Sequence, residues 1–180
     1  MLRHFTSAGP LFVGLLLLFS LSQCNTVRRL TAEPRVDTTR PGGPVDARLN
    51  RTQRDVVDLA RNQLGSRYKY AGNNAREGFD CSGLVAYVFR EQGISVDRTS
   101  STQARNGQAV DLQYLQPGDL VYFARSKGGN VFHIAIVTEV DRDLIQVVHS
   151  TSSRGVIEEN LLASSYWKPK IAGARRLIGK

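Results

Sequence analysis

One cysteine and two histidines supply the side chains that nucleophilic catalysis requires. Cys81 follows Asp80 at the start of an apolar run that closes at Gly93. A thiol in the first turn of a helix lies at the positive end of the helix dipole, which favours the thiolate and lowers the thiol pKa. We therefore interpret Cys81 as a nucleophile. The alternative is that Cys81 is only a small buried apolar residue.

His133 and His149 belong to two β-branched segments, 132–137 and 143–149, which a polar corner separates. If these segments form a hairpin symmetric about Asp141, His133 faces His149 directly, with Cβ atoms about 4.5–5.5 Å apart. We expect His133 to accept the thiol proton and return it to the leaving amine, while His149 holds His133 in the required tautomer. A turn one residue longer or shorter would shift this pairing. Each histidine alone is also compatible with a satisfied group in the core.

The same site needs hydrogen-bond donors for an oxyanion. We assign this role to the backbone N–H of Cys81, with the hydroxyl of Tyr68 as a second donor. A rival hypothesis makes Cys81, His133 and His149 three ligands of a zinc ion, but the sequence has no Cys-x-x-Cys or His-Glu-x-x-His spacing. Because thiolate, imidazole and backbone dipoles cover the chemistry, we expect no metal and no organic cofactor.

Helices are expected first along the chain and strands later. Thr52-Gln-Arg-Asp55 is similar to a capping box and is followed by apolar residues at helical spacing up to Gly65. The segment 79–90 is apolar on nearly every side, which favours a buried helix with Asp80 as its N-cap. Three short β-branched segments predict strands: 119–124, 132–137 and 143–149. This order predicts an α+β fold.

Length and composition limit the possible functions. The chain has 180 residues, of which 41% are hydrophobic, and this suits one ordinary domain with extra segments. Two cysteines exclude a disulfide-rich scaffold. The formal net charge of +8 indicates an anionic partner, such as a wall polymer, lipid head groups or nucleic acid.

The first 24 residues have the features of an export signal. They contain no Asp or Glu, and their apolar run from Leu11 to Leu21 is too short for a comfortable membrane span. The run ends at Leu21-Ser22-Gln23-Cys24, which resembles the site where bacterial lipoproteins are cleaved and lipidated. We therefore expect 1–24 to be a signal peptide and Cys24 to anchor an exported lipoprotein in the cell envelope. The alternative is a plain secreted protein without the lipid.

The segment that follows the signal differs in composition from the rest of the chain. Residues 25–50 contain scattered prolines and arginines and few apolar side chains. Such a segment cannot bury enough surface to offset its chain entropy, so we expect a flexible tether. The folded domain then spans residues 51–180.

Seven pieces of the chain form a recognisable series of motifs. They are Tyr68-Lys-Tyr-Ala-Gly72, Gly78-Phe-Asp-Cys-Ser-Gly-Leu84, Arg98-Thr-Ser, Leu115-Gln-Pro-Gly-Asp-Leu-Val121, His133-Ile-Ala-Ile-Val137, His149-Ser and Tyr166-Trp-Lys-Pro-Lys-Ile-Ala-Gly-Ala-Arg-Arg176. In this order they resemble the NlpC-like family of bacterial cell-wall cysteine peptidases. Together they cover nearly all of residues 52–178. The four residues Asp-Cys-Ser-Gly alone would be a weak signal, whereas all seven pieces in sequence are a strong one.

The resemblance implies a papain-like α+β fold and hydrolysis of peptidoglycan stem peptides, typically between γ-D-glutamyl and a diamino acid. It places the nucleophile at Cys81, the general base at His133, the orienting residue at His149 and the active-site tyrosine at Tyr68. In the family pattern three further residues would bind substrate: Asp80, Ser82 and Arg98. For Asp80 the alternative is a pure helix cap, and for Arg98 a solvated surface charge.

Two departures from the family pattern affect the shape of the cleft. Ala71 stands where the family usually has the first glycine of a pair, and the loop from Gly72 to Gly78 is one residue longer than usual.

The expected partners are stem peptides or muropeptide fragments and a membrane, with no nucleic acid, and we expect a monomer. One rival is an inactive wall-binding module, and the other is an amidase or acyltransferase that uses the same trio.

Overall fold

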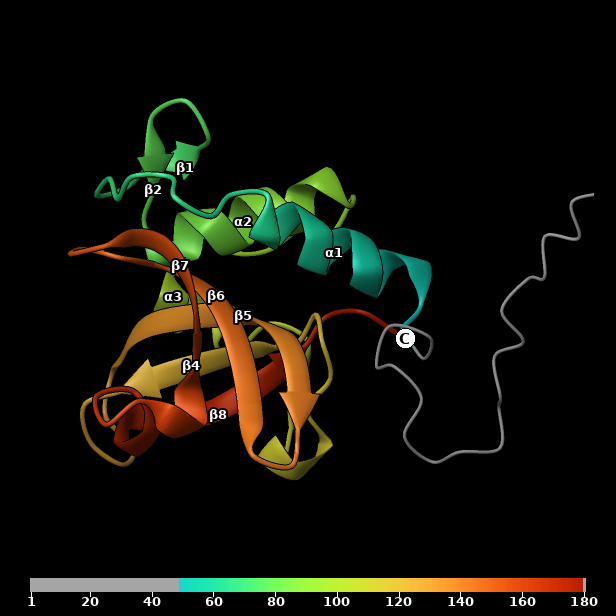
Figure 1. The fold of residues 1–180 in the computed structure, drawn as a ribbon, viewed down its shortest axis with the longest axis vertical. Helices are drawn as coiled ribbons and strands as arrows, with labels where there is room; N and C mark the ends of the chain where they lie inside the picture. The colour runs from blue at the N-terminus through green and yellow to red at the C-terminus, as the bar shows by residue number, and fades with distance from the viewer. Residues whose placement is uncertain (1–48, 180) are drawn as a thin grey trace, which may run out of the picture. The chain divides into compact units, whose positions relative to one another are not determined.

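The computed structural model describes residues 49–179. The predicted signal peptide 1–24, the lipidation site Cys24 and nearly all of the predicted tether 25–50 lie outside the described residues. All three α-helices precede the strands of the six-stranded sheet, so the predicted α+β class is confirmed (Figure 1).

Three α-helices and eight strands form the described part. The α-helices are α1 (Arg51–Arg61), α2 (Cys81–Glu91) and α3 (Ser100–Gln103). The strands are β1 (Asn73–Asn74), β2 (Gly78–Phe79), β3 (Gln108–Val110), β4 (Leu120–Ala124), β5 (Val131–Asp141), β6 (Leu144–Thr151), β7 (Gly155–Asn160) and β8 (Ile171–Arg176). Short 3-10 helices span Leu112–Tyr114, Leu161–Ala163 and Lys168–Lys170.

The two long helices begin at side-chain caps. Asn50 and Gln53 form the capping box of α1, so the box predicted at Thr52 and Asp55 was two residues late. Asp80 caps α2 as predicted, because its carboxylate accepts a hydrogen bond of 2.6 Å from the backbone N–H of Gly83. Such a cap stabilises a helix by about 1 kcal/mol.

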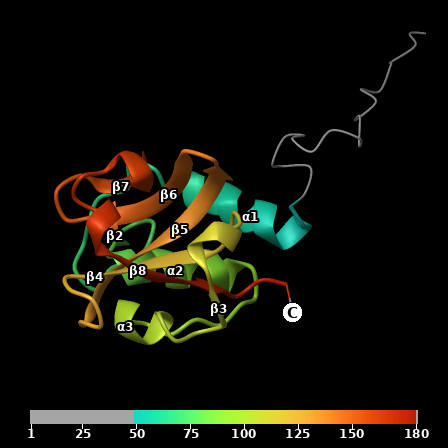
Figure 2. The ribbon, with the colours of Figure 1, turned by 90° about the horizontal axis from the view of Figure 1, so that it is seen from below.

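One antiparallel sheet carries the helices on one face. Its strand order is β3-β8-β4-β5-β6-β7, and α1 and α2 lie across it (Figure 1). From below, α2 lies behind β5 and β8 (Figure 2). Alternate residues of each strand point to opposite faces, so two apolar clusters form. Ile134 and Ile136 of β5 face the helices, whereas Ala135 and Val137 face a second cluster that contains Trp167.

The hairpin of β5 and β6 differs from the predicted one. Its turn is Arg142–Asp143, so Asp141 pairs with Leu144 and is not the centre of the hairpin. A β-bulge then shifts the register, because Glu139 pairs with Gln146 while Val137 pairs with Val147. The prediction that His133 faces His149 directly was therefore wrong.

The bulge nevertheless puts both histidines on one face. The extra residue, Thr138, changes which residues of β5 and β6 share a face. Continuing the register of Ile136 with Val148 places His149 beside Ala135, two residues from His133. The two imidazoles are diagonal neighbours on the sheet, close enough for long side chains to touch.

Candidate active site

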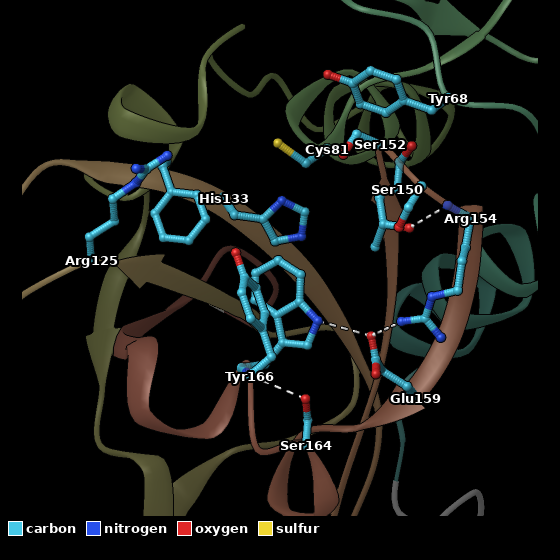
Figure 3. A pocket seen from close by; sticks show the side chains of 14 residues that line it. Tyr68, Cys81, Arg125, His133, Ser150, Ser152, Arg154, Glu159, Ser164 and Tyr166 are labelled. Atoms are coloured by element: carbon cyan, nitrogen blue, oxygen red, sulfur yellow. Dashed lines mark hydrogen bonds and ion pairs between the residues drawn. The ribbon is translucent and has the colours of Figure 1, made fainter.

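A pocket of about 530 Å³ opens where the start of α2 meets β5 and the segment after β6. Figure 3 shows the thiol of Cys81 and the ring of His133 pointing into it, with Tyr68 on one side and Tyr166 on the other. Its lining residues are Tyr68, Cys81, Arg125, Phe132, His133, Ser150, Thr151, Ser152, Ser153, Arg154, Glu159, Ser164, Tyr166 and Trp167.

Cys81 is the first residue of α2, and tight packing fixes this end of the helix. A Cβ atom at Gly83 would lie 1.9 Å from the carbonyl oxygen of Gly72. Only glycine therefore lets the preceding loop cross so close to the first turn of the helix. The same loop binds the helix start, because the backbone N–H of Asp80 donates to the carbonyl of Gly72 over 3.1 Å.

The thiol of Cys81 does not have the lowered pKa that its helix position predicted. Burial raises the pKa of Cys81, and the carboxylate of Asp80 adds to the rise. Backbone groups of Ile134, Ser82 and Cys81 itself act in the opposite direction and are outweighed. The resting thiol is therefore protonated, and a base must take its proton during attack.

His133 and His149 are buried and joined through their rings. His133 Nε2 lies 2.9 Å from His149 Nδ1, so the predicted contact exists although its register differs. Burial lowers the pKa of His133 to about 3, with His149 acting in the same direction. Burial and the positive charge of Arg154 lower the pKa of His149 to about 4. Both rings are neutral at pH 7, so His133 is able to accept a proton.

Two residues beside the histidines were not predicted as functional. Glu159 Oε1 lies 2.8 Å from His149 Nε2 and accepts a bond of 3.0 Å from the indole N–H of Trp167. The indole stacks on the ring of His133, with centroids 4.5 Å apart and planes at 23°. Trp167 therefore packs on the candidate base. The contact between Glu159 and His149 depends on how β6 pairs with β7, so Glu159 could be found only with that register known.

The other predicted site residues lie either in the pocket lining or in a separate hydrogen-bonded group. Tyr68 lines the pocket, and burial and the nearby Cys81 and Asp80 raise the pKa of its hydroxyl, so it remains a donor. Asp80, Ser82 and Arg98 are not among the lining residues, and they bind one another. Arg98 donates to both carboxylate oxygens of Asp80 over 3.0 and 2.8 Å and to the hydroxyl of Ser82 over 3.0 Å. Their role in substrate binding stays a prediction.

Two further findings on the described residues concern metal-binding groups and membrane-spanning helices. Within 49–179 no three or more His, Cys, Asp or Glu side chains are grouped so that they could hold a metal ion. In that same part of the chain, no helix has the length and apolar character needed to cross a membrane.

Comparisons with known proteins identify the family. The model of the NlpC/P60 family matches residues 65–176. The chain is 42% identical over 124 residues to a gamma-DL-glutamyl hydrolase of Bacillus subtilis (strain 168), covering 68% of this chain and 29% of that protein. It is 30% identical over 193 residues to the murein DD-endopeptidase MepS/murein LD-carboxypeptidase of Escherichia coli (strain K12), covering 99% and 96%.

A solved structure gives the same result. An NlpC/P60 family protein from Bacillus cereus ATCC 10987 matches with a TM-score of 0.64 and 35% identity, covering 71% of this chain and 40% of that one. This chain thus spans less than half of that structure and less than a third of the B. subtilis hydrolase. The predicted papain-like fold and the predicted family are confirmed. The chain belongs to the NlpC/P60 family.

Proposed function

We propose that this chain is a cell-wall cysteine endopeptidase that hydrolyses peptidoglycan stem peptides, at the bond between γ-D-glutamyl and a diamino acid. The observation that carries the proposal is the placement of Cys81 and His133 in one pocket, with the ring of His133 bonded to that of His149. This arrangement suits amide hydrolysis through a thioester.

In the proposed acylation, Cys81 Sγ attacks the carbonyl carbon of the scissile amide while its proton passes to His133. The oxyanion accepts hydrogen bonds from the backbone N–H of Cys81 and the hydroxyl of Tyr68. When the intermediate collapses, the C–N bond breaks and the amine leaves with the proton held by His133. A thioester on Cys81 remains.

In the proposed deacylation, His133 takes a proton from water, and the resulting hydroxide attacks the thioester carbonyl. The C–S bond then breaks, and the thiolate of Cys81 recovers its proton from His133. The net change is one amide plus one water to one carboxylate and one ammonium group. No redox step is needed, and the enzyme returns to its neutral resting state.

The substrate class is supported by relatives and by the pocket. Besides the glutamyl hydrolase above, a gamma-D-glutamyl-L-lysine dipeptidyl-peptidase of Bacillus cereus is 37% identical over 125 residues. Both names refer to a glutamyl bond. Arg125 and Arg154 line the pocket, and their positive charges would attract the carboxylates that such peptides carry.

Product analysis tests the reaction. The purified protein is incubated with defined muropeptides under reducing conditions, and the products are identified by mass. A gain of one water and a new amino group on the diamino acid support the proposal. Transfer of an acyl chain would indicate the acyltransferase, and binding without any product would indicate an inactive wall-binding module.

We propose that the protein acts as an exported monomer held in the cell envelope by a lipid on Cys24. The support is the apolar run that ends at Leu21-Ser22-Gln23-Cys24. In cells fed labelled palmitate, the protein should carry label that Cys24→Ala abolishes. Equal labelling of both proteins would contradict the anchor.

A further inference from the structure

We propose that Glu159 is a positioning residue for the reaction of Cys81, because it fixes the tautomer of His149 and, through it, that of His133. This proposal rests on the proposed cysteine peptidase function. Glu159 lies on β7, two strands away from His133, and bonds the imidazole of His149 directly.

The three side chains form one line across three neighbouring strands. His133 Nε2 is 2.9 Å from His149 Nδ1, and His149 Nε2 is 2.8 Å from Glu159 Oε1. The His149 side chain is fully buried, and that of Glu159 is 20% exposed. With no solvent access at His149, its ring nitrogens have only these two partners within hydrogen-bond distance among the described residues.

The chemistry of the partners allows one arrangement of protons. A carboxylate only accepts hydrogen bonds, so His149 Nε2 must carry a hydrogen and donate it to Glu159. His149 is neutral at pH 7, which leaves its Nδ1 as an acceptor. His133 Nε2 must then be the donor between the rings, and His133 Nδ1 is left with a free lone pair. That lone pair is what a base needs to take the proton of Cys81.

Other donors hold the carboxylate in place. Glu159 Oε1 also accepts bonds of 3.0 Å from the indole of Trp167 and from the guanidinium of Arg154 (Figure 3). Three donors on one oxygen restrict the rotamer of Glu159. The carboxylate would also stabilise the positive charge that His133 gains during attack.

The neighbouring glutamate provides a contrast. Glu158 alternates with Glu159 along β7 and points to the other face. It binds Arg61 over 2.9 Å and the hydroxyl of Thr138 over 2.6 Å, and neither contact reaches the pocket. Glu158→Gln is therefore a matched control with the same change of charge.

Two variants and two readouts test the proposal in the full-length protein. Glu159→Gln keeps the shape and an acceptor oxygen but removes the charge, and kcat on a defined muropeptide should fall about tenfold. Glu159→Ala also removes the acceptor, and kcat should fall about a hundredfold. In both variants KM should change by a smaller factor than kcat, because Glu159 bonds His149 directly and reaches the substrate only through its neighbour Arg154. Glu158→Gln should match the wild type.

Nitrogen-15 NMR of labelled histidine reports the tautomers without any substrate. The wild type should show a protonated Nε2 and a bare Nδ1 on both rings at pH 7, and Glu159→Ala should show a mixture at His149. A hydrogen on His149 Nδ1 in the wild type, or kcat unchanged in both Glu159 variants, would overturn the proposal. If the wild type cleaves no muropeptide, the proposed function fails, and the NMR result alone decides the role of Glu159.

Discussion

The ring nitrogens His133 Nε2 and His149 Nδ1 lie 2.9 Å apart inside the protein, on neighbouring strands. His149 therefore holds one side of the His133 ring, which leaves Nδ1 of His133 free for another partner. Cys81 lines the same pocket as His133. A proton that leaves the thiol would thus reach a ring whose orientation is fixed by a second ring.

The reactivity of the thiol should depend on His133. Because the pKa of Cys81 is raised by burial and by Asp80, the thiolate is scarce at pH 7 unless a base takes the proton. In His133→Ala, alkylation of Cys81 by iodoacetamide at pH 7 should slow by at least about tenfold. Mass spectrometry of the modified protein over time gives the rate. Equal rates in the two proteins would show that His133 does not receive the thiol proton.

Different substitutions of His149 should lower kcat by different amounts. Asparagine offers a carbonyl oxygen to the N–H of His133, as in Cys-His-Asn sites, whereas alanine offers no partner and leaves a cavity. We expect kcat to fall about tenfold in His149→Asn and about a thousandfold in His149→Ala. Steady-state kinetics on a defined muropeptide measure both. An alanine variant as active as the asparagine variant would remove the orienting role of His149.

Acid should destabilise the fold through the two buried histidines. Their pKa values of about 3 and about 4 lie below the value of about 6.5 in an unfolded chain. Below about pH 6.5 the unfolded state therefore binds protons that the folded state does not, and the free energy of unfolding falls by about 1.4 kcal/mol per pH unit for each histidine. This loss continues until pH approaches the folded pKa values.

Urea unfolding at a series of pH values between 7 and 4.5 measures this effect. In His149→Asn, which lacks one of the two groups, the fall of stability with acid should be shallower by about 1.4 kcal/mol per pH unit. Other acidic groups contribute equally in both proteins, so the difference isolates the histidine. Parallel pH profiles would mean that His149 is protonated in the folded state.

Substitutions at two adjacent residues of the loop before α2 should change the stability of the protein in opposite directions. Ala71 adopts a left-handed conformation with φ of 59°, which costs a residue with a Cβ atom about 1 kcal/mol. Ala71→Gly should therefore stabilise the protein by up to about 1 kcal/mol. At Gly72 an added Cβ would lie 2.4 Å from the carbonyl oxygen of Gly78, so Gly72→Ala should destabilise by about 1–3 kcal/mol. Thermal unfolding measures both, and equal signs would contradict the loop geometry.

The start of α2 could be predicted because it depends on local sequence. Asp80 caps the helix and Cys81 occupies its first position, as the order of residue types indicates. The thiol pKa could not be predicted in the same way. It depends on how deeply the packed chain buries Cys81, and an isolated helix N-terminus does not contain that information.

The histidine contact was predicted from a hairpin with the wrong register. The symmetric corner about Asp141 is replaced by a turn at Arg142–Asp143, and Thr138 then adds a bulge. The bulge puts His133 and His149 on one face. Neither the turn length nor a bulge is visible as a periodic pattern, since both follow from the packing of both faces of the sheet. For the same reason, the contact of Glu159 with His149 could not be predicted from the sequence.

The central claim is that Cys81 is the nucleophile of a peptide-bond hydrolysis. The most direct measurement follows cleavage of one defined γ-D-glutamyl muropeptide by the wild type and by Cys81→Ala, with binding of the same peptide measured in parallel. We expect the variant to bind the peptide with an affinity within about threefold of the wild type and to cleave it at least about a thousandfold more slowly. Cleavage by Cys81→Ala at a rate close to that of the wild type would contradict the claim.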